Sequence, residues 1–134
     1  MSDAADTIGR QRLSRALADR RSGVLKLQLD TVQVAQEGER AGWQIVGLHA
    51  VGDRKTFLQE CQKAFDLPDW FGVNWDALAD SLSDVQPLPG MLVIWSGSAG
   101  LDRETRDIAA EIFAERAGEG PAPFVVAQLG LEHT

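Results

Sequence analysis

The sequence predicts an α/β fold in which a small, mainly parallel sheet is covered by helices. Segments with helical periodicity alternate with short strand-like segments along the chain, as in proteins built from strand–helix–strand units. Residues 91–95 form a continuous apolar run, which is typical of a strand buried on both faces of a parallel sheet. With 134 residues, 44% of them hydrophobic, the chain is long enough for one buried core. We therefore expect a single globular domain.

The first 42 residues are expected to form a helix, a strand and a short helix. Residues 10–21 place leucines on one side of a helix, and residues 24–29 alternate between apolar and polar side chains as a strand does. Residues 31–41 are weakly helical, because Gly38 interrupts them. We treat residues 1–42 as an N-terminal extension, able to add a strand, and residues 43–134 as the main domain.

The main domain begins with a candidate strand over residues 43–48. Asp53 suits the N-cap of the next helix, whose apolar residues fall at 3.6-residue spacing and which ends before Pro68. Cys61 lies within that apolar pattern. We expect its thiol to belong to the core rather than to act as a nucleophile.

Asn74 is a good N-cap for a helix over residues 75–83. Three apolar residues share one side of this helix and are expected to face inward: Trp75, Leu78 and Leu82. The acidic residues are expected to face outward: Asp76, Asp80 and Asp84.

The last third of the chain predicts a helix and a final strand. Asp102 can cap a helix with an apolar stripe that includes Ile108, Ile112 and Phe113. Gly118 and Gly120 are expected to end that helix. Residues 124–129 then supply the last strand.

The charge is distributed unevenly along the chain. The formal net charge is -7, which disfavours direct binding to nucleic acid or to an anionic membrane. Residues 64–102 contain no Lys or Arg. The same stretch holds six aspartates: Asp66, Asp69, Asp76, Asp80, Asp84 and Asp102. Aspartates four residues apart on a helix repel each other by roughly 0.2–0.5 kcal/mol, so stability alone does not explain this stretch.

The segment over residues 67–82, Leu-Pro-Asp-Trp-Phe-Gly-Val-Asn-Trp-Asp-Ala-Leu-Ala-Asp-Ser-Leu, resembles the signature of barstar-family ribonuclease inhibitors. The shared features are Leu-Pro, two aromatic residues, a glycine, an asparagine and a helix with two aspartates four residues apart. The resemblance extends over roughly residues 43–130 and implies a barstar-like α/β fold. It also implies an intracellular inhibitor that occludes the basic active site of a barnase-type ribonuclease with an acidic helix face.

The resemblance implies a set of partner-binding residues: Trp70, Gly72, Asn74, Asp76, Asp80, Ser83 and Glu115. Independently of it, Asp76 and Asp80 are one helical turn apart, which places their carboxylates ~6 Å apart on one face, where they can imitate successive RNA phosphates. Asp76 lies in the first turn, where the helix dipole stabilises it, whereas Asp80 gains much less from the dipole. Asp80 therefore has the stronger claim to serve a partner.

Three positions depart from the family pattern. Ala79 stands where the best-known member has a tryptophan, Val85 replaces an aromatic residue, and Val73 lacks the expected acid. These departures leave the acidic residues in place but favour a related ribonuclease as much as barnase itself.

An enzyme is the less favoured interpretation, since no His, Cys or Lys accompanies the aspartates in this motif. We expect His49, at the end of a strand, and His133, in the terminal tail, to be structural or solvated. Carboxylates along one straight helix converge poorly on a cation, so we expect no metal site. We also expect no catalytic residue and no cofactor. A further alternative is an immunity or regulatory protein of this fold that binds a different toxin or a non-nuclease partner. A hydrophobic partner of this kind would depend on Trp70 and neighbouring apolar residues, whereas a basic nuclease pocket would depend on Asp80.

The remaining expectations concern location and assembly. The lone Cys61 gives no disulfide framework and favours a reducing cytoplasm. The sequence holds no apolar run long enough to span a bilayer, so we expect no membrane partner. We expect a monomer, although the sequence leaves the oligomeric state open.

Overall fold

The computed structural model describes residues 3–67, 74–84, 90–119 and 122–130, and side chains from residue 7 onward. The helices of these residues are α1 (Asp3–Ala18), α2 (Thr31–Ala41), α3 (Arg54–Ala64), α4 (Trp75–Ser83) and α5 (Arg103–Ala117), with a short 3₁₀ helix, η1 (Ser98–Gly100). The strands are β1 (Gly23–Leu27), β2 (Gln44–His49), β3 (Met91–Ser96) and β4 (Phe124–Leu129). The predicted α/β fold class is confirmed.

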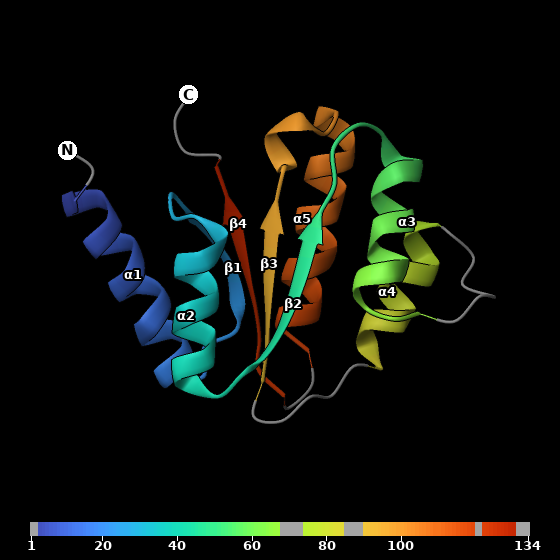
Figure 1. Ribbon diagram of the computed structural model, residues 1–134. Coiled ribbons are helices and arrows are strands. Elements are labelled where there is room, and N and C mark those ends of the chain that lie inside the picture. Colours follow the sequence, from blue (N-terminus) through green and yellow to red (C-terminus); the bar gives the residue numbers. More distant parts are fainter. Residues whose placement is uncertain (1–2, 68–73, 85–89, 120–121, 131–134) are drawn as a thin grey trace.

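The four described strands form one sheet in the order β1-β4-β3-β2, and every pair is parallel. The chain therefore starts at one edge of the sheet, crosses to the other edge through α2, and returns through β3 to β4. Helices α1 and α2 lie on one side of the sheet and α3, α4 and α5 on the other (Figure 1). The molecule has three layers, with the sheet in the middle.

The central strands bury both of their faces. In β3, Met91, Val93 and Trp95 belong to the core cluster beneath α3, α4 and α5. Leu92 and Ile94, which alternate with them, belong to the cluster beneath α1 and α2. The continuous apolar run of the sequence is thus explained by two cores that share one strand, as expected for a parallel sheet.

The extension differs from its sequence prediction at its boundaries. Helix α1 ends at residue 18, because Arg20 takes a left-handed φ of 56°, and it begins at residue 3 rather than residue 10. The first turns of α1 have no apolar stripe from which a helix could be predicted. They nevertheless pack on the protein at Gly9, which is buried against the Leu29 side chain. Strand β1 pairs in parallel with β4, so the expectation that the extension adds a strand is confirmed.

Helix α2 is stronger than its composition suggests. Asp30 and Gln33 form a capping box, in which each side chain accepts a hydrogen bond from the other residue's backbone. A Cβ at Gly38 would lie 2.7 Å from Leu92 Cδ2 and 3.1 Å from Ile45 Cδ1. The glycine that weakens the helix is therefore the residue that lets α2 approach the sheet closely.

The three predicted N-caps of the main domain are present. Asp53, Asn74 and Asp102 each accept a hydrogen bond from the backbone N–H three residues later. These caps set the starts of α3, α4 and α5. Among the described residues, no helix is both long enough and apolar enough to cross a bilayer.

Candidate functional site

Helix α4 carries the two aspartates singled out by the sequence, and its local structure is set by Asn74. The Asn74 side-chain oxygen accepts a hydrogen bond from the Ala77 N–H at 2.8 Å. Leu78 and Leu82 are fully buried, as predicted. Trp75 is only half-buried, since its ring packs at the margin of the core with its centroid 5.9 Å from that of Phe57. The helix is thus held by its cap and by one buried stripe.

The outward face of α4 is acidic. Asp76, Asp80 and Asp84 are all exposed, which confirms the predicted orientation. Asp76 lies in the first turn, while Asp84 is the C-cap. The last turn of the helix contains no basic residue. Asp80 therefore lies between the carboxylates of Asp76 and Asp84, and the last turn of α4 supplies no cation to neutralise them.

Helix α5 places Glu115 beside this face. Phe113, two residues earlier, is fully buried, and its ring lies within 6.4 Å of four other aromatic rings. Those rings belong to Phe57, Phe65, Trp95 and Phe124. Because Phe113 is locked in this cluster, the α5 backbone is held firmly, and Glu115 is presented from its exposed side.

A depression of about 160 Å³ lies between α4 and α5, which we call the acidic depression. Seven residues line it: Ala79, Asp80, Ser83, Ile112, Glu115, Arg116 and Glu119. Of the predicted partner-binding residues, the structure brings Asp80, Ser83 and Glu115 together here. Asp76 lies one turn before Asp80 and does not line the depression.

Arg116 forms the base of the acidic depression. Its side chain is only 3% exposed, and its Nε donates a hydrogen bond to the Leu82 carbonyl at 2.7 Å. A second nitrogen donates to the Glu119 carbonyl at 3.2 Å, and the guanidinium lies 4.8 Å from the centre of the Phe124 ring. Desolvation by burial lowers the pKa of Arg116, but an arginine stays charged at physiological pH. A buried cation thus lies beneath exposed carboxylates.

Ser83 links the two helices on the surface. Its hydroxyl contacts the Ala79 carbonyl at 3.1 Å and Oε1 of Glu119 at 3.3 Å. The second contact turns the Glu119 carboxylate toward α4. Ala79 has a small side chain, so the wall of the depression beside Asp80 stays low.

Two predicted site residues, Trp70 and Gly72, lie outside the described residues, as do Val73 and Val85. Asn74 serves as the cap of α4, so its side-chain oxygen is already engaged within the protein. The structure does not test any of these residues as partner contacts.

Sequence reasoning missed Arg116 and Glu119. Arg116 follows Ile112 by four residues and Phe113 by three, so helical periodicity places it on the inward face. That spacing was the available signal. Glu119 comes after the end of α5, where periodicity gives no orientation.

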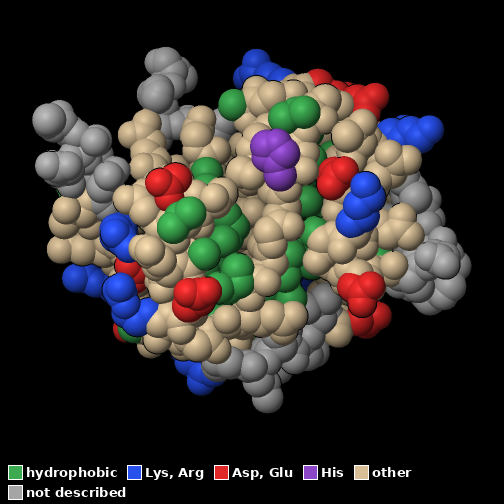
Figure 2. Space-filling view, viewed as in Figure 1, with side chains coloured by type: hydrophobic (Ala, Val, Ile, Leu, Met, Phe, Trp, Pro, Cys, Tyr) green, Lys and Arg blue, Asp and Glu red, His purple; other side chains and the backbone are tan. Residues whose placement is uncertain are grey.

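Two other residues that could support chemistry, Cys61 and His49, are described by the structure. Cys61 is fully buried, and desolvation raises the pKa of its thiol, which makes it a poor nucleophile. His49 is exposed with its Nδ1 2.9 Å from the Ser96 hydroxyl, and Figure 2 shows a histidine side chain on the surface. His133 lies outside the described residues. Within the described residues, no three His, Cys, Asp or Glu side chains are grouped so that they could hold a metal ion.

Comparison with known proteins identifies the family. A search of curated proteins finds no match to the chain. The family model described as barstar, barnase inhibitor, matches residues 44–127, which is more than half of the chain and includes α4, α5, β2, β3 and most of β4. Barstar is a family of inhibitors rather than of catalysts. On this match, and with the parallel α/β sheet described above, the chain belongs to the barstar family.

Proposed function

We propose that this protein inhibits a ribonuclease of the barnase type by covering the enzyme's basic active site with the face formed by α4 and α5. The observation that carries the proposal is the acidic depression, where Asp80 of α4, Glu115 of α5 and Glu119, just after the end of α5, line one hollow. A ribonuclease must hold cationic side chains to bind phosphate, and carboxylates on a rigid surface pair well with guanidinium groups.

The rigidity of the face supports the proposal. Asn74 caps α4, Phe113 anchors α5, and Arg116 joins the end of α4 to α5. A surface that is already ordered before binding loses less entropy when a partner docks. Inhibition would follow from occlusion, without any chemical step in the inhibitor.

The small Ala79 bears on which ribonuclease fits. Since Ala79 lines the acidic depression next to Asp80, the hollow has room for a side chain of the partner. We propose a ribonuclease whose surface fills this space, related to barnase but separate from it. A reducing compartment, the cytoplasm, belongs to the same proposal and is supported by the buried, unpaired Cys61.

The test is a titration of the protein against an active barnase-type ribonuclease while RNA cleavage is followed. Stoichiometric inhibition is expected. Asp80→Ala should weaken the complex by about 2–5 kcal/mol, the range found when one partner of a buried charge pair is truncated at protein interfaces, those of barstar with barnase among them.

Asp84→Ala is the matched control, since it removes the same charge four residues later, at the C-cap of α4, from a residue that does not line the depression. Equal losses in the two variants would mean that only overall charge matters. If the unmodified protein did not inhibit, the family and the fold would stand, but the proposal of a ribonuclease partner would be wrong. A different toxin captured from the source cell would then become the proposed partner.

A further inference from the structure

Strand β1 ends the described sheet and has a free edge. It pairs with β4 alone, and the Leu27 carbonyl accepts a hydrogen bond from the Gly130 N–H at 3.2 Å. Alternate residues of a parallel strand bond to opposite sides, so the backbone groups of Val24 and Lys26 point away from β4. The Lys26 carbonyl indeed accepts a hydrogen bond from Arg12 at 3.2 Å, on the outer side. This edge therefore presents main-chain donors and acceptors to a partner.

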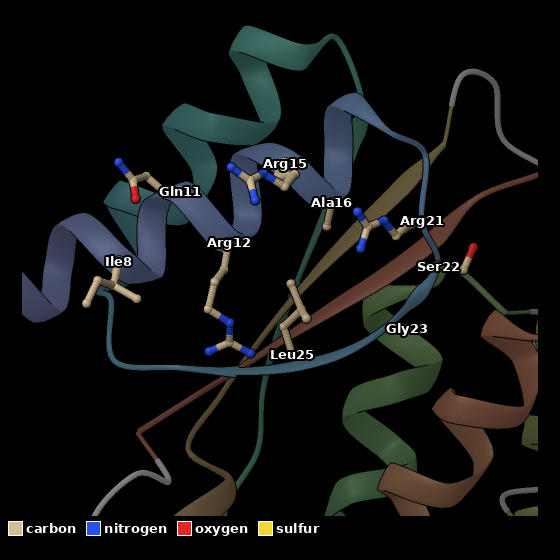
Figure 3. A pocket seen from close by; sticks show the side chains of 9 residues that line it. All are labelled: Ile8, Gln11, Arg12, Arg15, Ala16, Arg21, Ser22, Gly23 and Leu25. Carbon is tan, nitrogen blue, oxygen red and sulfur yellow. The ribbon is translucent and has the colours of Figure 1, made fainter.

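A groove of about 380 Å³ runs beside this edge, between α1 and β1 (Figure 3), and we call it the basic groove. Nine residues line it: Ile8, Gln11, Arg12, Arg15, Ala16, Arg21, Ser22, Gly23 and Leu25. Three of them are arginines and none is acidic. In Figure 3 the Arg12 side chain extends from α1 toward β1.

The arginines of the groove keep donors available. Arg21 forms an exposed ion pair with Asp19 at 3.0 Å, a kind of pair that contributes little and exchanges readily. Arg12 uses one contact on Lys26, while a guanidinium carries five N–H donors. The buried carboxylate of Glu37 is paired with Arg10 and Arg40, which do not line the groove. The basic groove is thus a positive site on a protein of net charge -7.

The shape of the groove favours a peptide over a nucleic acid. Its lining includes apolar carbon from Leu25, Ala16 and Ile8, of which Ile8 is 58% exposed. An extended chain that pairs with a strand edge points alternate side chains to the same face, so carboxylates could meet the arginines. A nucleic acid backbone has no alternating N–H and C=O groups with which to pair along a strand edge.

We propose that the free edge of β1 and the basic groove together bind an extended, acidic peptide segment of another protein, which adds to the sheet as a further strand. The arginines select carboxylates on the segment, and its main-chain hydrogen bonds are made with the outward N–H and C=O of Val24 and with the N–H of Lys26, since the Lys26 carbonyl already accepts from Arg12. This site lies in residues that precede the matched family range of 44–127 and at the edge opposite β2. The proposal therefore stands independently of ribonuclease inhibition.

The experiment uses the full-length protein, isotope-labelled for NMR, and a blocked synthetic peptide that alternates glutamate with valine. The amide signals of Val24 and Lys26 are expected to shift on binding and to become protected from hydrogen exchange. Replacing Arg12→Gln and Arg15→Gln together should weaken binding at least about tenfold, since charge-assisted hydrogen bonds are lost. The matched control is Arg54→Gln with Arg103→Gln, which changes the net charge equally at the starts of α3 and α5 and should bind normally.

A second pair of variants tests the strand edge itself. Lys26→Pro removes the outward N–H without removing a ladder bond, so the fold should persist while peptide binding falls. Lys26→Ala keeps the N–H and should bind nearly as well as the unmodified protein. Equal binding by Lys26→Pro and Lys26→Ala would overturn strand addition.

Other outcomes would also overturn the proposal. Tighter binding of an oligoadenylate RNA than of the peptide would make the groove a phosphate site. Self-association of the protein that disappears in the Arg12→Gln, Arg15→Gln variant would make a second copy the occupant. No shift of the Val24 and Lys26 signals at millimolar peptide would leave the groove without this ligand.

Discussion

Arg116 joins α5 to the end of α4, because its Nε donates a hydrogen bond of 2.7 Å to the Leu82 carbonyl from a side chain that is almost fully buried. The carbonyls of a last helical turn lack partners within the helix, and cations are favourable near them. Since α4 has no basic residue in its own last turn, α5 supplies the cation. The orientation of Asp80 relative to Glu115 depends on this contact.

Replacing Arg116→Met should lower the free energy of unfolding by about 1–3 kcal/mol, because the Leu82 and Glu119 carbonyls lose a charged donor. The stability of Arg116→Lys should lie between that of the unmodified protein and that of Arg116→Met, since one ammonium group cannot reproduce the planar set of donors. Urea denaturation measures both variants. Unchanged stability in Arg116→Met would show that the contact contributes nothing to the fold.

Phe113 and Glu115 are two residues apart on α5 and should behave in opposite ways. Phe113→Ala is expected to cost about 3–5 kcal/mol of stability, because it empties the centre of the aromatic cluster. Glu115→Ala should leave the melting temperature nearly unchanged and weaken partner binding. Calorimetry and binding on the same two proteins give the comparison. A large loss of stability in Glu115→Ala would assign that residue to the fold instead.

Association with a ribonuclease should be fast at low salt and slow markedly as salt rises. The exposed carboxylates of α4 and α5 steer a cationic partner over distances that salt screens beyond ~8–10 Å. Stopped-flow mixing at increasing sodium chloride measures the association rate. A rate that is independent of salt would contradict steering by these residues.

Asp53 and Asp102 should contribute to acid sensitivity. The backbone N–H of Thr56 lowers the pKa of Asp53, and that of Thr105 lowers the pKa of Asp102, from an ordinary value of 3.8. Because the folded protein favours the charged carboxylates, their contribution is fully present above about pH 3.8 and is lost as the pH falls through the lowered values.

The matched variant is Asp53→Asn with Asp102→Asn, since asparagine also caps helices but does not titrate. Its stability near pH 7 should resemble that of the unmodified protein, while its decline on acidification should be shallower. Thermal melts between pH 7 and pH 2 make the measurement. Parallel declines in the two proteins would exclude these caps as the source.

The sequence predicted α4 with both of its ends, because Asn74 is a strong cap and the leucines recur at helical spacing. The sequence underestimated the helical character of α2, because a glycine within a helix is ordinarily destabilising. The close approach of Gly38 to Leu92 explains why a glycine is present there. Local patterns describe caps and stripes, whereas close packing of a helix on a sheet depends on residues far away in the chain.

The site was predictable in part. Asp76 and Asp80 follow from spacing within one helix, whereas Glu115 was identified only by resemblance to the family. The acidic depression depends on contacts such as that between Ser83 and Glu119, which are 36 residues apart. Arg116 looks like an ordinary surface arginine by residue type. The predicted division of the chain after residue 42, and the partner roles of Trp70 and Gly72, stay predictions.

The pairing of β1 with β4 also governs the order in which the protein can be assembled. The Phe124 N–H donates a hydrogen bond to the Ser22 hydroxyl at 3.0 Å, and these residues are 102 positions apart. The ribosome releases α1, β1 and α2 long before β4 is made. Strand β1 therefore has no strand to pair with until synthesis is nearly complete. Contacts of such separation close large loops and slow folding. The pairing of the N-terminal strand with β4 therefore cannot be completed until nearly the whole chain has been synthesised.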